Sequence, residues 1–156
     1  MKPKSQKHAM YNEVIQFAIS KEQEAIDLYS DMAGRVRSPG SKVMFKELAD
    51  MEKGHKAKLE KVDKTYFAKK KVEVPLDLKI SDYLVDVQLK SDSSYQDILL
   101  YAAKRERAAY DLYTDLAQVY ASVPEIKKMF AVLAQEEAGH KLKLEREYDD
   151  NVYKEG

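Results

Sequence analysis

MFKELADMEKGHKAKLE (residues 44–60) and MFAVLAQEEAGHKLKLE (residues 129–145) are two copies of one segment, identical at eleven of seventeen positions. A second pair, EQEAIDLYSDMA (residues 22–33) and ERAAYDLYTDLA (residues 106–117), is identical at seven of twelve. The offset between copies is 85 residues for the first pair and 84 for the second. Both halves of the chain therefore hold the same two segments in the same order, which predicts two repeated αα-hairpins.

Capping signals place the helices within these repeats. Ser38-Pro39 and Ser122-Val123-Pro124-Glu125 are typical of helix N-termini, and Ser94 is a weaker cap. We expect helices at about 9–36, 40–68, 94–119 and 123–148.

A long crossover, about residues 69–93, separates the second and third predicted helices. Pro75 and the β-branched residues around it argue against a continuing helix, although SDYLVDV (residues 81–87) could form a short helical turn. The segment is long enough to run along a bundle, which a simple hairpin connection does not need. The predicted fold class is all-α, a four-helix bundle of two repeated αα-hairpins joined by this crossover.

Length and composition limit the class of protein. A chain of 156 residues fits a single domain, residues 1–156. Lys plus Arg and Asp plus Glu both number 27, so no charge imbalance indicates nucleic acid or a membrane surface as partner. The absence of cysteine excludes disulfides and Cys-ligated clusters. The longest apolar run, residues 98–103, is too short to span a bilayer, and we expect a cytoplasmic location.

The apolar face of each predicted helix carries one carboxylate at mid-length, and two of these faces add a histidine one turn later. Steps of three and four residues place each set on the core-facing stripe of its helix. The residues are Glu22, Glu52, His55, Glu106, Glu137 and His140.

Four carboxylates at one level of a bundle core would be costly without a cation. Burying one unpaired carboxylate costs several kcal/mol, and neighbouring carboxylates repel one another as well. No Lys or Arg lies on these stripes at that level. Two divalent ions would supply four positive charges, and the imidazoles are suitable neutral ligands. The pattern predicts a dinuclear metal site.

Two further pairs of repeated residues accompany the predicted ligands. Tyr29 and Tyr113 follow the first carboxylates by two turns, either as core aromatic residues or as hydrogen-bonding or relay groups beside the site. Gly54 and Gly139 stand just before the histidines, at a cost of about 1 kcal/mol each relative to alanine. A close backbone approach or a local helix distortion would explain these glycines.

The pattern E-x-x-A-x-x-x-Y, followed about thirty residues later by E-x-x-H and occurring twice, resembles the ferritin-like diiron-carboxylate proteins, most closely the rubrerythrin group. The resemblance implies a ferritin-like bundle that binds two iron ions per chain, with manganese as an alternative. It also implies a role for each ligand: Glu22 and Glu106 terminal, Glu52 and Glu137 bridging, His55 and His140 completing the set.

Two departures from the group leave the reaction open. Rubrerythrins usually add a small Cys-ligated iron domain that delivers electrons, and they carry an extra glutamate where this chain has Ala109. The resemblance implies an oxidoreductase that reduces hydrogen peroxide or O₂ with electrons from a separate protein. It also implies that the protein is a homodimer. An iron-binding, ferroxidase or storage component without an organic substrate is the alternative. A metal-free helical interaction module is the third interpretation.

Overall fold

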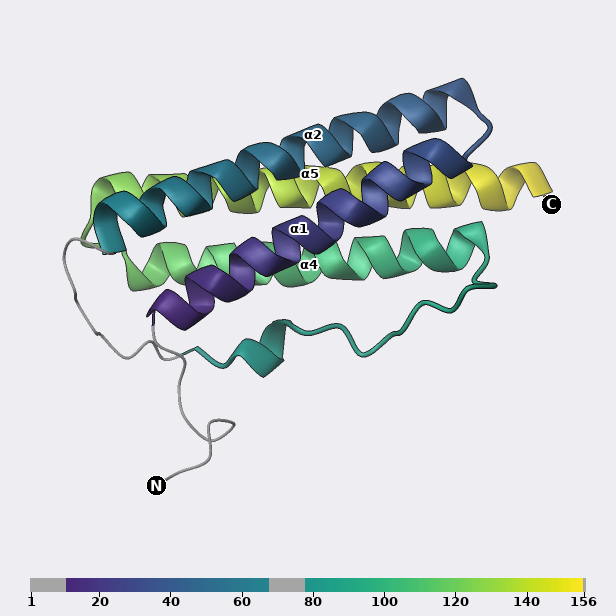
Figure 1. The fold of residues 1–156 in the computed structure, drawn as a ribbon. Helices are drawn as coiled ribbons and strands as arrows, with labels where there is room; N and C mark the ends of the chain where they lie inside the picture. Colours follow the sequence, from purple (N-terminus) through teal and green to yellow (C-terminus); the bar gives the residue numbers. More distant parts are fainter. Residues whose placement is uncertain (1–10, 68–77, 156) are drawn as a thin grey trace. The chain divides into compact units, whose positions relative to one another are not determined.

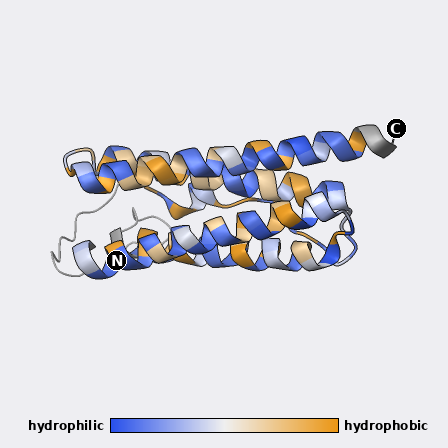
Figure 2. Cartoon of the chain, turned by 90° about the horizontal axis from the view of Figure 1, so that it is seen from above, coloured by the Kyte–Doolittle hydropathy of each residue, from blue (hydrophilic) through white to orange (hydrophobic). Residues whose placement is uncertain are grey.

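The computed structural model describes residues 11–67 and 78–155, and within these ranges it contains long α-helices and no β-strand (Figure 1). The α-helices are α1 (Tyr11–Arg35), α2 (Pro39–Val62), α4 (Tyr95–Val119) and α5 (Pro124–Glu155). Figure 2 shows hydrophilic and hydrophobic residues on the same helices, as expected for amphipathic helices. No described helix combines the length and the low charge content that a membrane span requires.

The chain forms two compact units, with the boundary between Ile80 and Ser81. Each unit contains one of the two predicted αα-hairpins, α1 with α2 and α4 with α5. The prediction of a single domain over residues 1–156 stays a prediction.

The first hairpin turns at Ser38, where the prediction placed the start of a helix. Ser38 is the N-cap of α2, its side-chain oxygen accepts a hydrogen bond from the Ser41 amide at 3.5 Å, and Pro39 begins the helix. Apart from the candidate ligands, the core-facing stripes predicted from steps of three and four residues are mostly apolar in this hairpin. Its fully buried side chains include Ile15, Tyr29, Phe45, Leu48 and Leu59.

The second helix ends earlier than predicted as an α-helix. α2 stops at Val62, and a wider π-helical turn, Asp63–Phe67, follows it, whereas we predicted one helix over 40–68. The Thr65 hydroxyl donates to the Lys61 carbonyl at 2.8 Å, and such back-bonding by Thr within a helix favours local distortion. The predicted last residue, 68, lies outside the described residues.

The second hairpin starts at Ser94, whose side-chain oxygen accepts a hydrogen bond from the Asp97 amide at 3.1 Å. Its last helix is longer than predicted, because α5 continues to Glu155 and we placed its end at 148. Between the predicted end at residue 148 and Gly156 the sequence has neither Gly nor Pro, the residues that most often end a helix. Tyr95 also ties this end of α5 to the start of α4, because its hydroxyl donates to Glu147 at 2.5 Å.

The described part of the crossover runs back along α4 (Figure 1). It contains a short 3₁₀ turn, Ile80–Tyr83, close to the helical turn predicted for residues 81–87. The Tyr83 hydroxyl donates to Asp115 near the end of α4 at 2.6 Å, and eleven residues later Ser94 caps its start. Burial, together with the hydrogen bond to Asp115, raises the pKa of Tyr83 above its ordinary value. Pro75 lies outside the described residues.

Candidate metal centre

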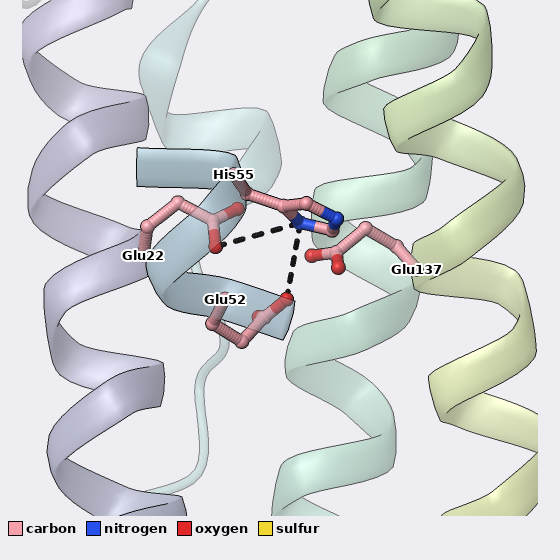
Figure 3. A group of neighbouring side chains, drawn as sticks. All are labelled: Glu22, Glu52, His55 and Glu137. Atoms are coloured by element: carbon pink, nitrogen blue, oxygen red, sulfur yellow. Dashed lines mark ion pairs between the residues drawn. The ribbon is translucent and has the colours of Figure 1, made fainter. Parts of the chain in front are cut away.

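The first hairpin brings its three predicted ligands together (Figure 3). Glu22 comes from α1, and Glu52 and His55 come from successive turns of α2. Nδ1 of His55 lies 3.1 Å from Oε1 of Glu52 and 3.7 Å from Oε2 of Glu22. All three residues are at most 2 % exposed. Two carboxylates and one imidazole therefore converge within the hairpin.

The second hairpin repeats this geometry with Glu106 from α4 and with Glu137 and His140 from α5. Nδ1 of His140 lies 3.2 Å from Oε1 of Glu137 and 3.7 Å from Oε2 of Glu106. Both distances agree with those in the first hairpin within 0.1 Å. The sequence repeat is thus also a repeat of side-chain arrangement.

Helix periodicity explains why the glutamate and the histidine of each Glu-x-x-His pair lie close together. Residues three apart lie on the same face, so a glutamate and a histidine at this spacing can reach one point. In α2 and α5 that face is the buried one, and apolar residues precede and follow the pair. In each hairpin, one possible ligand atom from each of the three residues lies within 4.8 Å of the others.

Several basic side chains near the ligands in sequence contact other polar side chains. Lys21 pairs with Glu24 at 2.9 Å, and Arg107 with Asp111 at 3.2 Å. Lys56, which follows His55, donates to the Gln23 amide oxygen at 2.7 Å. The contacts of Lys141 include an ion pair with the Glu145 carboxylate at 3.0 Å.

The residues fit a metal ion by the chemistry of their donors. Each hairpin holds two buried carboxylates and one histidine, so a protonated imidazole would offset one of the two negative charges. A divalent cation would offset both and accept a neutral imidazole as ligand. Carboxylate oxygen with imidazole nitrogen suits iron and manganese. Among the described residues, the groups able to hold a metal consist of these same six side chains.

The two tyrosines lie in the core beside aromatic neighbours. Tyr29 and Tyr113 are each 1 % exposed, and their ring centroids lie 6.0 Å from Phe45 and 6.1 Å from Phe130, respectively. The structure therefore agrees with the interpretation as core residues, and a relay role stays a hypothesis.

Gly54 and Gly139 are exposed, and a Cβ added at either would have open space within 4 Å. A close backbone approach does not explain these glycines within the part of the chain that the structure describes. Residues 39–62 and 124–155 are α-helical throughout, so no change of helix type marks either position.

Sequence reasoning missed the polar contacts between residues far apart in the chain. Two of them are the contact of Lys56 with Gln23, beside Glu22 and His55, and the attachment of the crossover to α4 through Tyr83 and Asp115. Both join residues more than thirty positions apart, 33 and 32 respectively. No local pattern could have indicated either pair.

The repeated hairpins and their Glu and Glu-x-x-His sets are those of the ferritin-like carboxylate proteins. The family model for rubrerythrin matches residues 13–91 and 97–155, and the chain belongs to this family. A solved structure of a hypothetical protein from Pyrococcus furiosus is similar with a TM-score of 0.70 and 27 % sequence identity. The match covers 88 % of this chain and 87 % of that one, and it confirms the predicted fold class, a ferritin-like four-helix bundle. No curated protein matches the sequence significantly.

Proposed function

We propose that the two sets of ligands form one dinuclear iron centre and that the protein is a non-haem diiron oxidoreductase that reduces hydrogen peroxide or O₂. The observation that carries the proposal is the duplicated buried arrangement of two carboxylates around one Nδ1 atom, in a chain of the rubrerythrin family. A structural role alone does not account for two identical buried sets with an excess of negative charge.

Each ligand has an assigned role in this proposal. Glu22 and Glu106 would each hold one metal, Glu52 and Glu137 would be shared between the two, and His55 and His140 would complete the set. Bound iron would supply a change of oxidation state, which carboxylates accommodate because they shift between terminal and bridging modes. Manganese is the alternative metal.

The protein's own contribution is to position the ligands and to exclude water. Nδ1 of His55 and of His140 points toward the carboxylate oxygens, so the ring orientation required of a ligand is already present. The apolar residues one turn away on α2 and α5, Leu48, Leu59, Leu133 and Leu144, are almost fully buried. Such a shell lowers the local dielectric and strengthens the attraction between the carboxylates and a cation.

The composition of the chain bears on the source of electrons for this reaction. The chain contains no cysteine, so it has no Cys-ligated cluster with which to deliver electrons to the centre. We propose that a separate protein supplies them. A cytoplasmic location and the lack of a nucleic-acid partner belong to the same proposal.

The same absence of cysteine favours the second candidate, a ferroxidase or iron-storage component. In that function ferrous iron is the reductant as well as the cargo, and no electron-donor protein is needed. The two candidates share the metal centre and differ in the source of electrons, which is a donor protein in the first and ferrous iron itself in the second.

Stopped-flow oxidation of the ferrous-loaded protein separates the candidates. The oxidoreductase proposal predicts rapid reoxidation by hydrogen peroxide and multiple turnovers when a chemical reductant is supplied. The storage alternative predicts iron uptake well beyond two ions per chain and a large assembly in size-exclusion chromatography. Reoxidation no faster than that of free ferrous iron in the same buffer would contradict both.

A further inference from the structure

A short chain of side-chain hydrogen bonds joins α1 to α2 at the level of the candidate ligands. Nζ of Lys56 donates to Oε1 of Gln23 at 2.7 Å, and Nε2 of Gln23 donates to Oδ1 of Asp27 at 2.8 Å. Gln23 directly follows Glu22, and Lys56 directly follows His55. This contact, the Gln23–Lys56 bridge, therefore ties the two helices together one residue away from a candidate ligand on each of them.

The second hairpin has the same residues at the equivalent positions, with one exception. Asp27, Lys56 and Glu60 of the first hairpin correspond to Asp111, Lys141 and Glu145 of the second. Gln23 corresponds to Arg107. Among these four positions, which we call the bridge positions, the two hairpins thus differ at a single residue.

That single difference changes which side chains pair. Arg107 and Lys141 both carry donors and no acceptor, so neither can accept a hydrogen bond from the other. Each pairs within its own helix, Arg107 with Asp111 at 3.2 Å and Lys141 with Glu145 at 3.0 Å. The bridge positions of α4 and α5 therefore cannot form the contact between helices that Gln23 makes possible in the first hairpin.

We propose that Gln23 is a positioning residue, through which the ion held by Glu22 and His55 binds more tightly than the ion held by Glu106 and His140. This inference rests on the proposed dinuclear centre, since it concerns how strongly each hairpin holds its ion. A bridge that already joins the two helices beside the ligands reduces the conformational entropy that metal binding has to remove. The ligands of the second hairpin have no such bridge at the equivalent positions.

The charges at the bridge positions favour the same order of affinity. In the first hairpin they comprise one cation, Lys56, and two acids, so their formal charges sum to −1. In the second hairpin they comprise two cations, Arg107 and Lys141, and two acids, so the sum is zero. The first hairpin therefore offers a divalent ion the more negative surroundings. Added salt should weaken this part of the effect, because these side chains are partly exposed.

Calorimetric titration of the metal-free full chain with Mn²⁺ under anaerobic conditions assigns the affinities. Manganese suits the same carboxylate and imidazole ligands as iron. We expect the wild type to bind two ions in two steps. The tighter step should persist in His140→Ala and disappear in His55→Ala. A tighter step that persists in His55→Ala and disappears in His140→Ala would overturn the proposal.

An exchange of residues between the repeats tests the role of Gln23 itself. Gln23→Arg should weaken the tighter step about three- to tenfold, and Arg107→Gln should strengthen the weaker step by a similar factor, because Lys141 can then donate to α4 as Lys56 donates to α1. Gln23 is half-buried and Arg107 is exposed, and each new residue already occurs at the equivalent position of the other repeat, so both variants should fold. A purely structural role would change the free energy of unfolding and leave both Mn²⁺ affinities unchanged.

Glu24→Gln is the matched control for charge. Glu24 is the exposed neighbour of Gln23 on α1, and its neutralisation changes the charge by the same one unit as Gln23→Arg without removing the bridge. It should weaken the tighter step by less than Gln23→Arg does. Equal losses in the two variants would overturn the positioning role, because charge alone would then account for both.

Failure of this inference differs from failure of the proposed centre. A wild type that binds no Mn²⁺ would overturn both. A wild type that binds two ions, with affinities that neither Gln23→Arg nor Arg107→Gln alters, would leave the dinuclear centre in place and overturn the role of Gln23.

Discussion

Glu52 and His55 illustrate how far single residues can be predicted. The spacing of three within an apolar stripe identifies both as buried and as neighbours, and the structure confirms both points. The sequence could not show that Nδ1 is the atom that faces the carboxylate, because that depends on side-chain torsion angles rather than on spacing. Duplication made the interpretation possible, since a single Glu-x-x-His occurs in many helices.

Metal-free protein should become more stable when one buried carboxylate is neutralised. We expect Glu52→Gln to raise the free energy of unfolding by about 1–3 kcal/mol in chelator, because it removes a buried charge beside Glu22 while keeping the side-chain volume. Chemical denaturation of both proteins measures the difference. Glu60→Gln, on the exposed side of the same helix, should change stability by less than about 0.5 kcal/mol. A destabilised Glu52→Gln protein would show that Glu52 has a structural role.

Gly54 should tolerate a side chain. A Cβ at this exposed helical position meets open space, so Gly54→Ala should raise the free energy of unfolding by about 1 kcal/mol through helix propensity alone. Thermal unfolding of the metal-free variant tests this. Destabilisation would mean that the position needs glycine for a reason other than space around its Cβ.

Helix starts proved easier to predict than helix ends. Ser38 and Ser94 cap helices as predicted, because a hydroxyl that accepts from the third following amide is a local signal. The end of α2 is accompanied by the back-bond of Thr65, and α5 continues past residue 148 through a stretch without Gly or Pro. The contact of the crossover with α4 was missed because Tyr83 and Asp115 lie far apart in sequence.

Tyr83 should stabilise the crossover in a pH-dependent way. The hydrogen bond to Asp115 predicts that Tyr83→Phe lowers the free energy of unfolding by about 1–2 kcal/mol at neutral pH. Because the pKa of Tyr83 is raised in the folded protein, its contribution is complete below about pH 10 and declines as pH rises toward the folded value. Urea unfolding at pH 8 and at pH 11 should therefore show a smaller difference between wild type and Tyr83→Phe at pH 11.

Tyr148→Phe is the control for this comparison, since Tyr148 is a partly buried tyrosine on α5. Its substitution should leave the stability at pH 8 nearly unchanged. A Tyr83→Phe protein that matches the wild type at pH 8 would mean that the hydrogen bond adds nothing to stability.

Repetition determines the architecture of the molecule, and departures from repetition indicate what differs between its halves. The buried stripes are the same in both hairpins, so the fold class and the candidate ligands could be predicted from the sequence. The outer faces differ, and the buried stripes carry no information about them.

Metal binding should stabilise the whole protein. A ligand that binds only the folded state adds about 2.7 kcal/mol at one hundred times its dissociation constant, so ferrous or manganous ions should raise the melting temperature under anaerobic conditions. Chelator should reverse the gain. The metal-free interpretation predicts that neither metal nor chelator changes the melting temperature of the wild type. The Glu137→Ala variant, which lacks a proposed ligand, should show no such change in either case.

The most direct test of the account is the metal content of the protein isolated without added metal, measured together with that of Glu52→Ala and Glu137→Ala. We predict two iron or manganese ions per wild-type chain and no two-metal site in either variant. A wild type with no stoichiometric metal, or a variant that keeps two ions per chain, would contradict the assignment of the buried carboxylates as ligands.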